Sequence, residues 1–265
     1  MGQMLAMGHI RLGKLPASRK WRQVAGLLKQ SAEISALTAA VAKAAETELI
    51  SARGDPVLGH TLWLLTQLPL AARTDRFGAE LRALGFSPGS EQSLLNIVTG
   101  FSRAVDSQIS ESGRRTDLGE LARQAASESL STLVGLQLPS LLGPSPDDLR
   151  IELGKFDTKD RFAILARDFF ARLTHKTLDY YISRILADHV GPDRSIETLQ
   201  QQSQFKAALE DHCREASLIV EQFAGGWFSK ARFEGKLTRE SSQRFADYAL
   251  KKIRDELRAR RAENA

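Results

Sequence analysis

Apolar residues recur every three or four positions along most of the chain, and this spacing constrains the fold more than any other feature. Residues 94–109, 162–185 and 246–257 show it, as does the series Ile34, Leu37, Val41, Ala45 and Leu49. Side chains with this spacing share one face of an α-helix, which can be buried against another helix. The pattern predicts an all-α protein, a multi-helix bundle of about eight to ten helices.

Residues typical of helix starts occur between these apolar series. Asp55-Pro56 and Ser145-Pro146 each pair a capping side chain with a proline, which fits the first turn of a helix. Signals for β-strands are weak and include a brief alternation of apolar and polar residues in His9–Gly13. We therefore expect helices joined by short turns.

One proline-rich segment is the best candidate for a domain boundary. Three of the eight prolines fall in Pro139–Pro146, which divides the chain into 1–138 and 147–265. Leucines within the segment favour packing over a free linker, so we expect two helical lobes that share one core. Glycines and a proline predict an irregular start, over roughly the first 6–15 residues.

Charge is concentrated at the two ends of the chain. Residues 1–32 contain six basic and no acidic residues, and 229–265 contain eleven basic and six acidic residues. The formal net charge is +5, so the middle of the chain is mildly acidic. Basic ends of this kind can meet nucleic acid, an anionic membrane or an acidic protein surface, or the protein's own acidic middle.

The single cysteine, Cys213, excludes an intramolecular disulfide, a CxxC redox pair and a cysteine-rich zinc site. The sequence also lacks a stretch of 18 consecutive apolar residues, so we expect no membrane span. We infer a cytoplasmic location from this cysteine usage. The five histidines include no pair at the spacing of a helical metal motif, so we expect no metal site and no cofactor.

The candidate catalytic residues are Arg184 and His189. Their Arg-x(4)-His spacing resembles the motif of the HEPN family of all-α RNases, as does the longer spacing of Arg53 and His60. The resemblance implies that Arg184 and His189 would act on the ribose 2′-OH and the scissile phosphate. A chain with 25 arginines and five histidines produces one or two such matches by chance, however.

Basic residues line one face of the last predicted helix: Arg244, Lys251, Arg254, Arg258 and Arg261. Such a face can bind phosphate oxygens or an acidic protein partner. It can also be a solvated face with ion pairs along the helix, such as Asp247 with Lys251.

Aromatic residues cluster around Gly225-Gly226, where glycine predicts a weak point or kink in a helix. The cluster can pack the junction between two helices. If exposed, Trp227 or Phe228 would be a natural anchor for a partner protein.

From these patterns we predict a non-enzymatic scaffold or adaptor subunit of a cytoplasmic multi-protein assembly with one or more protein partners. Whether that assembly handles nucleic acid is left open, as is the oligomeric state. The alternatives are a HEPN-like helical RNase using Arg184 and His189, and direct DNA or RNA binding through the basic C-terminal helix.

Overall fold

The computed structural model describes residues 9–10, 19–29, 33–51, 53–86, 93–112, 115–139, 144–186, 196 and 198–263. They form an all-α, multi-helix bundle, as predicted. Eleven α-helices lie in this part of the chain: α1 (Arg19–Lys29), α2 (Ile34–Ser51), α3 (Pro56–Ala72), α4 (Phe77–Ala83), α5 (Leu94–Ser112), α6 (Asp117–Gly135), α7 (Pro146–Gly154), α8 (Lys159–Leu186), α9 (Leu199–Ala216), α10 (Leu218–Phe233) and α11 (Arg239–Glu263). A short 3-10 helix, Lys155–Asp157, separates α7 from α8.

The two predicted helix starts are confirmed, and in each a side chain caps the first turn. The carboxylate of Asp55 accepts hydrogen bonds from the backbone N–H of Val57 and Leu58, at 2.9 and 3.0 Å. Ser145 and Asp148 bond each other's backbone N–H at the start of α7. These contacts satisfy N–H groups that have no partner within the helix.

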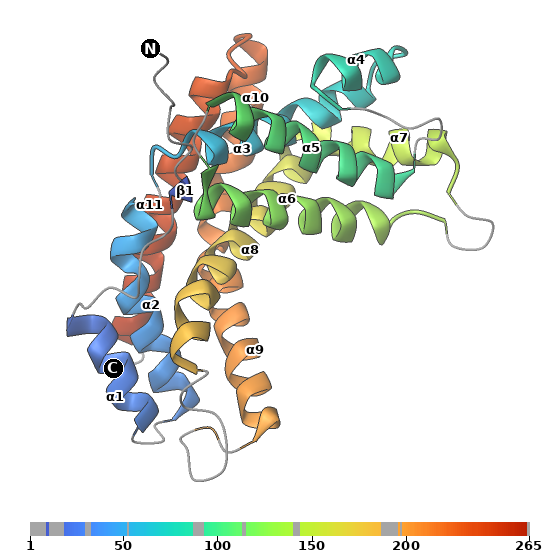
Figure 1. Ribbon diagram of the computed structural model, residues 1–265. Helices are drawn as coiled ribbons and strands as arrows, with labels where there is room; N and C mark the ends of the chain where they lie inside the picture. Colours follow the sequence, from blue (N-terminus) through green and yellow to red (C-terminus); the bar gives the residue numbers. More distant parts are fainter. Residues whose placement is uncertain are drawn as a thin grey trace, which may run out of the picture.

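The helices are arranged around α8 and α3, with α8 crossing the middle of the molecule in Figure 1. Helix α8 packs most extensively against α10, and also against α6 and α9. Helix α3 lies against α11, α6 and α7. In the same view α5, α6 and α7 extend to the right, α1 and α2 lie at the left, and α9 lies at the bottom.

Nearly all buried apolar side chains of the described residues belong to one cluster, which includes residues on both sides of the proline-rich segment. Leu62 of α3 and Phe101 of α5 lie in it together with Phe169 of α8 and Leu250 of α11. Residues of 1–138 and of 147–265 therefore share a core. The division into two lobes at Pro139–Pro146 itself stays a prediction.

Helix α10 runs without interruption through Gly225 and Gly226, so these two glycines do not end the helix, and the predicted kink stays a prediction. A Cβ atom at Gly225 would lie 2.5 Å from the carbonyl oxygen of Lys159, whereas one at Gly226 would meet nothing within 4 Å. Gly225 thus permits the close approach of α10 to the start of α8. The packing of α10 on α8 outweighs the intrinsic cost of each glycine, about 1 kcal/mol.

A buried carboxylate joins three helices. The side chain of Glu46, in α2, is 5% exposed and lies 3.3 Å from Lys20 Nζ of α1 and 2.9 Å from Arg258 Nη2 of α11. Burial by itself would raise the pKa of Glu46, but hydrogen bonds and charge from the two cations outweigh it and lower the pKa. Glu46 is therefore held as a carboxylate between α1 and α11.

Two short strands accompany the helices: β1 (His9–Ile10) pairs in parallel with β2 (Arg115–Thr116). Strand β1 lies within the segment His9–Gly13, whose alternation was the weak strand signal. In the described ranges, every helix falls short of the combined length and apolarity that crossing a membrane requires.

Candidate functional site

An aromatic groove lies between α10 and α11, with a cavity volume of about 460 Å³. The two helices are joined by residues 234–238, a connection short enough to make them antiparallel neighbours. Four aromatic side chains line the groove: Phe223 and Trp227 from α10, and Phe245 and Tyr248 from α11. Each pair is three or four positions apart on its helix, so both members share one face.

The rings pack against each other across the two helices. Trp227 stacks on Phe245 with ring centroids 4.1 Å apart, and Phe223 meets Tyr248 edge-on at 5.0 Å. Phe245 is buried, Phe223 and Trp227 are half-buried, and Tyr248 is 46% exposed. The groove thus has a fixed aromatic floor that opens to solvent at Tyr248.

Contacts with other helices fix the position of the loop between α10 and α11. The indole N–H of Trp63, in α3, donates a hydrogen bond to the carbonyl oxygen of Leu237 at 3.2 Å. The guanidinium of Arg239 lies over the Trp63 ring, 4.8 Å from its centroid. On α10 itself, Arg232 is paired with Asp157 next to the start of α8. The hairpin formed by α10 and α11 is therefore held in position by α3 and by the residues before α8.

Exposed cations surround the aromatic floor. Lys230 of α10, Lys236 of the loop and Arg244 of α11 line the groove, together with one acidic residue, Glu234. Lys236 Nζ lies 2.9 Å and Lys230 Nζ lies 4.0 Å from Glu234 carboxylate oxygens. The hydrogen bond from Lys236, with the charges of both lysines, lowers the pKa of Glu234. The rim of the groove is positively charged.

The two predicted anchor residues have different positions. Trp227 lines the groove, whereas Phe228 is 1% exposed and stacks on Phe162 of α8 with ring centroids 4.2 Å apart. Consecutive helical residues point about 100° apart, so α10 turns one aromatic side chain towards α8 and the other towards α11. The position of Phe228 rules out a role as a surface anchor, which corrects that part of the prediction.

Comparison with known proteins does not assign the chain to a family. No family model, curated protein or solved structure matches it.

The predicted basic face of α11 is partly used within the protein. Arg258 binds the buried Glu46, and Arg254 Nε donates to Asp255 at 2.9 Å. Lys251 and Arg244 are exposed, and the side chain of Arg261 lies outside the described residues. Among the members of the predicted set whose side chains are described, Arg244 alone lines the aromatic groove.

The RNase hypothesis rests on residues that the structure does not describe: the side chain of Arg184, in α8, and all of His189. The second match, Arg53 and His60, includes a histidine that the structure describes. His60 is buried in α3, and burial together with the charge of Arg239 lowers its pKa to about 4. The buried position of His60 does not fit a role in contacting RNA.

A smaller, polar cavity of about 210 Å³ lies between α6, α8 and α9. His175 lines it, and burial lowers the pKa of this imidazole. The charged side chains that line the cavity form ion pairs with one another at 2.7 to 2.9 Å: Arg172 with Asp168, Lys176 with Glu128, and Arg214 with Glu210. Cations and carboxylates balance, so the cavity has no net charge to select a charged ligand.

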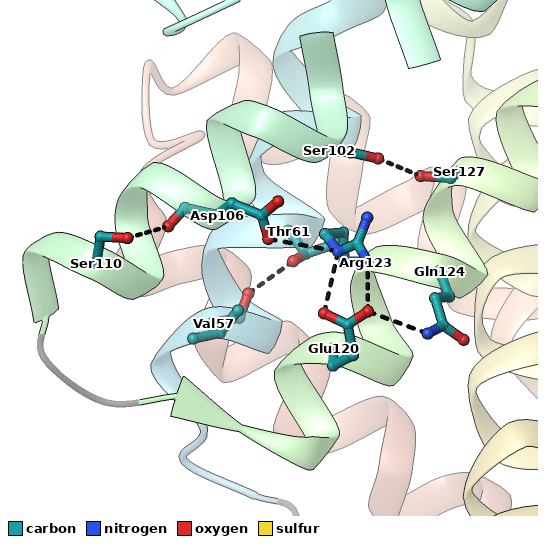
Figure 2. Close-up of polar contacts among 9 residues, drawn as sticks. All are labelled: Val57, Thr61, Ser102, Asp106, Ser110, Glu120, Arg123, Gln124 and Ser127. Atoms are coloured by element: carbon teal, nitrogen blue, oxygen red, sulfur yellow. Dashed lines mark hydrogen bonds and ion pairs between the residues drawn. The ribbon is translucent and has the colours of Figure 1, made fainter. Parts of the chain in front are cut away.

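Polar contacts between α5 and α6 are likewise structural. Figure 2 shows Arg123 between Asp106 and Glu120, with a hydrogen bond of 3.0 Å between the hydroxyls of Ser102 and Ser127 nearby. Within the described ranges, no cluster of three histidine, cysteine or acidic residues could hold a metal ion. Cys213 is buried, and burial raises the pKa of its thiol, which keeps it protonated.

Sequence reasoning identified Trp227 and Arg244 but not the groove that contains both. Phe245 and Tyr248 were missed, although their spacing of three positions on one helix was a usable signal. Their position opposite Phe223 and Trp227 depends on how α10 and α11 pack, which is a tertiary property.

Proposed function

We propose that this protein is a non-enzymatic helical adaptor that binds a segment of a partner protein in the aromatic groove between α10 and α11. It would act as a subunit of a cytoplasmic multi-protein assembly. The observation that carries the proposal is the groove itself. Four aromatic side chains line a solvent-open space of about 460 Å³ on a hairpin supported by α3 and α8.

The composition of the groove supports a protein partner. Aromatic and arginine side chains are enriched at the centres of protein interfaces, and a polar rim commonly surrounds them. Because the ring contacts are already formed, binding would require little ordering of this surface. An amphipathic segment can cover the exposed part of Tyr248 with apolar side chains while its polar side faces the rim.

A nucleic-acid partner fits the same groove less well. Stacking of bases requires free aromatic faces, and here Trp227 and Phe245 already stack on each other. Lys252 lies over the ring of the exposed Tyr248, 5.5 Å from its centroid. Two cations expected to follow a phosphate backbone, Arg254 and Arg258, are engaged with carboxylates of this chain.

Site-specific photocrosslinking in the source cells tests the proposal. A photoreactive phenylalanine would replace Tyr248, and a matched control would carry it at Leu95 of α5, an exposed apolar position. We expect a discrete protein adduct from position 248 that the control at 95 does not give.

The crosslinked protein would then be purified and its dissociation constant measured against two variants. Loss of an aromatic anchor commonly weakens binding by about tenfold or more, so Tyr248→Ala should raise Kd by that factor. Leu95→Ala should leave Kd unchanged. Equal affinity of the wild type and Tyr248→Ala would overturn the proposal.

A further inference from the structure

We infer that the segment bound in this groove is acidic and carries apolar anchor residues; this deepens the proposed function and rests on it. The groove is lined by three cations, Lys230, Lys236 and Arg244, against the single carboxylate of Glu234. The cations come from α10, the connecting loop and α11, so positive charge lies on both sides of the aromatic floor. A segment that covers the aromatic side chains must therefore pass between these cations.

The present partners of these cations are exposed and exchangeable. Glu234 is shared by Lys230 and Lys236, so one carboxylate faces two ammonium groups. Arg244 pairs with Glu240 one turn earlier on α11, and the Glu240 side chain is 79% exposed. Exposed ion pairs contribute little to stability, so carboxylates from a bound segment can replace or add to these contacts.

Other charges on α11 reinforce the positive rim. Lys252 lies beside Tyr248, and Lys251 is exposed one residue earlier. The nearby carboxylate of Asp247 is occupied elsewhere, since it accepts hydrogen bonds from the backbone N–H of Gly54 at 2.8 Å and from Gln243 at 3.0 Å. The charge available to a partner at this groove is therefore predominantly positive.

The length of the groove sets the length of a useful probe. Its lining on α10 extends from Phe223 to Ala231, which corresponds to about 12 Å of helix. A peptide of 12 residues covers that distance as a helix, and exceeds it when extended. A display library of random 12-residue peptides, selected against the full chain, can therefore report the preferred chemistry.

The experiment selects peptides on the wild type and measures the Kd of the enriched ones by fluorescence anisotropy. One variant combines Lys230→Glu, Lys236→Glu and Arg244→Glu. Its matched control combines Arg22→Glu, Arg82→Glu and Arg103→Glu, three exposed arginines on α1, α4 and α5. Circular dichroism would confirm that both variants are folded, and Tyr248→Ala would report whether a peptide uses the groove.

We expect enriched peptides that combine aspartate or glutamate with leucine or aromatic residues. Each exposed charge pair changes affinity by about twofold to fivefold, so the groove variant should raise Kd by about tenfold or more. The control should change Kd by less than about twofold, and added salt should weaken binding of the wild type.

The alternative outcomes separate this inference from the proposed function. If Tyr248→Ala weakens binding but the peptides are neutral or basic, the acidic preference is wrong and the groove remains a protein-binding site. If no enriched peptide depends on Tyr248, the proposed function fails as well. If a single-stranded oligonucleotide displaces the peptides with higher affinity, the groove binds nucleic acid and both proposals are overturned.

Discussion

The burial of one residue, His60, should make the stability of the whole chain depend on pH. It lies in α3 beside Trp63, with ring centroids 5.5 Å apart, and is 5% exposed. Burial and the charge of Arg239 lower its pKa, and a hydrogen bond with the backbone of Ala104 opposes them only in part. The folded protein therefore holds His60 neutral at acidities where an exposed histidine is already protonated.

This position predicts a loss of stability in acid. As the pH falls below 6.5, the unfolded chain binds a proton at His60 that the folded chain does not accept until about pH 4. The free energy of unfolding should fall across this range, by roughly 3 kcal/mol from this group, and then level off. Urea denaturation between pH 7 and pH 4 would measure it.

The control for this measurement is His60→Gln, which cannot titrate. Its stability should depend less steeply on pH over the same range, even if it is lower at pH 7. The pKa values of His175 and His212 are also lowered by burial, and both remain in the variant. An identical pH dependence in the wild type and His60→Gln would contradict this account.

At the scale of elements, two adjacent glycines of α10 have different roles. A Cβ atom at Gly225 would clash with the backbone of α8, so Gly225→Ala should destabilise the protein by about 1–3 kcal/mol. Gly226→Ala meets open space within the helix and should be neutral or stabilise it by up to about 1 kcal/mol. Equal effects in chemical denaturation would mean that α10 does not approach α8 as described.

The contact of α11 with α2 gives a second prediction at this scale. Arg258→Glu places a carboxylate beside the buried Glu46 and should lower the free energy of unfolding by roughly 3 kcal/mol or more. Lys251→Glu reverses an exposed charge on the same helix and should change it by less than about 0.5 kcal/mol. Thermal or urea denaturation of the two variants would show whether Arg258 has this structural role.

These elements also show what the sequence predicts and what it cannot. The apolar spacings of 34–49, 94–109, 162–185 and 246–257 fall within α2, α5, α8 and α11, because amphipathic periodicity is a local signal. The continuity of α10 was not predictable, since packing against Lys159 overrides local propensity. The sequence places Arg258 on the basic face of the last helix but does not show its partner, Glu46, which is distant along the chain.

The net charge of +5 does not say where on the molecule positive charge is available to a partner, and the arrangement of the whole molecule does. Several cations of the basic C-terminal region are directed at the protein's own acids, as Arg258 is at Glu46 and Arg260 at Glu215. The cations around the groove have exposed partners instead. Because one apolar core supports α3, α8, α10 and α11, the groove is presented as a preformed surface.

The most direct test of this account is to follow the tryptophan indole N–H signals by NMR while an enriched peptide or the crosslinked partner is added. Trp227 lines the groove, whereas Trp21 is buried in α1, which lies at the other end of the molecule from α10 in Figure 1. The account predicts that the Trp227 signal shifts in proportion to binding while the Trp21 signal does not move. Saturating binding that leaves the Trp227 signal unchanged would contradict it.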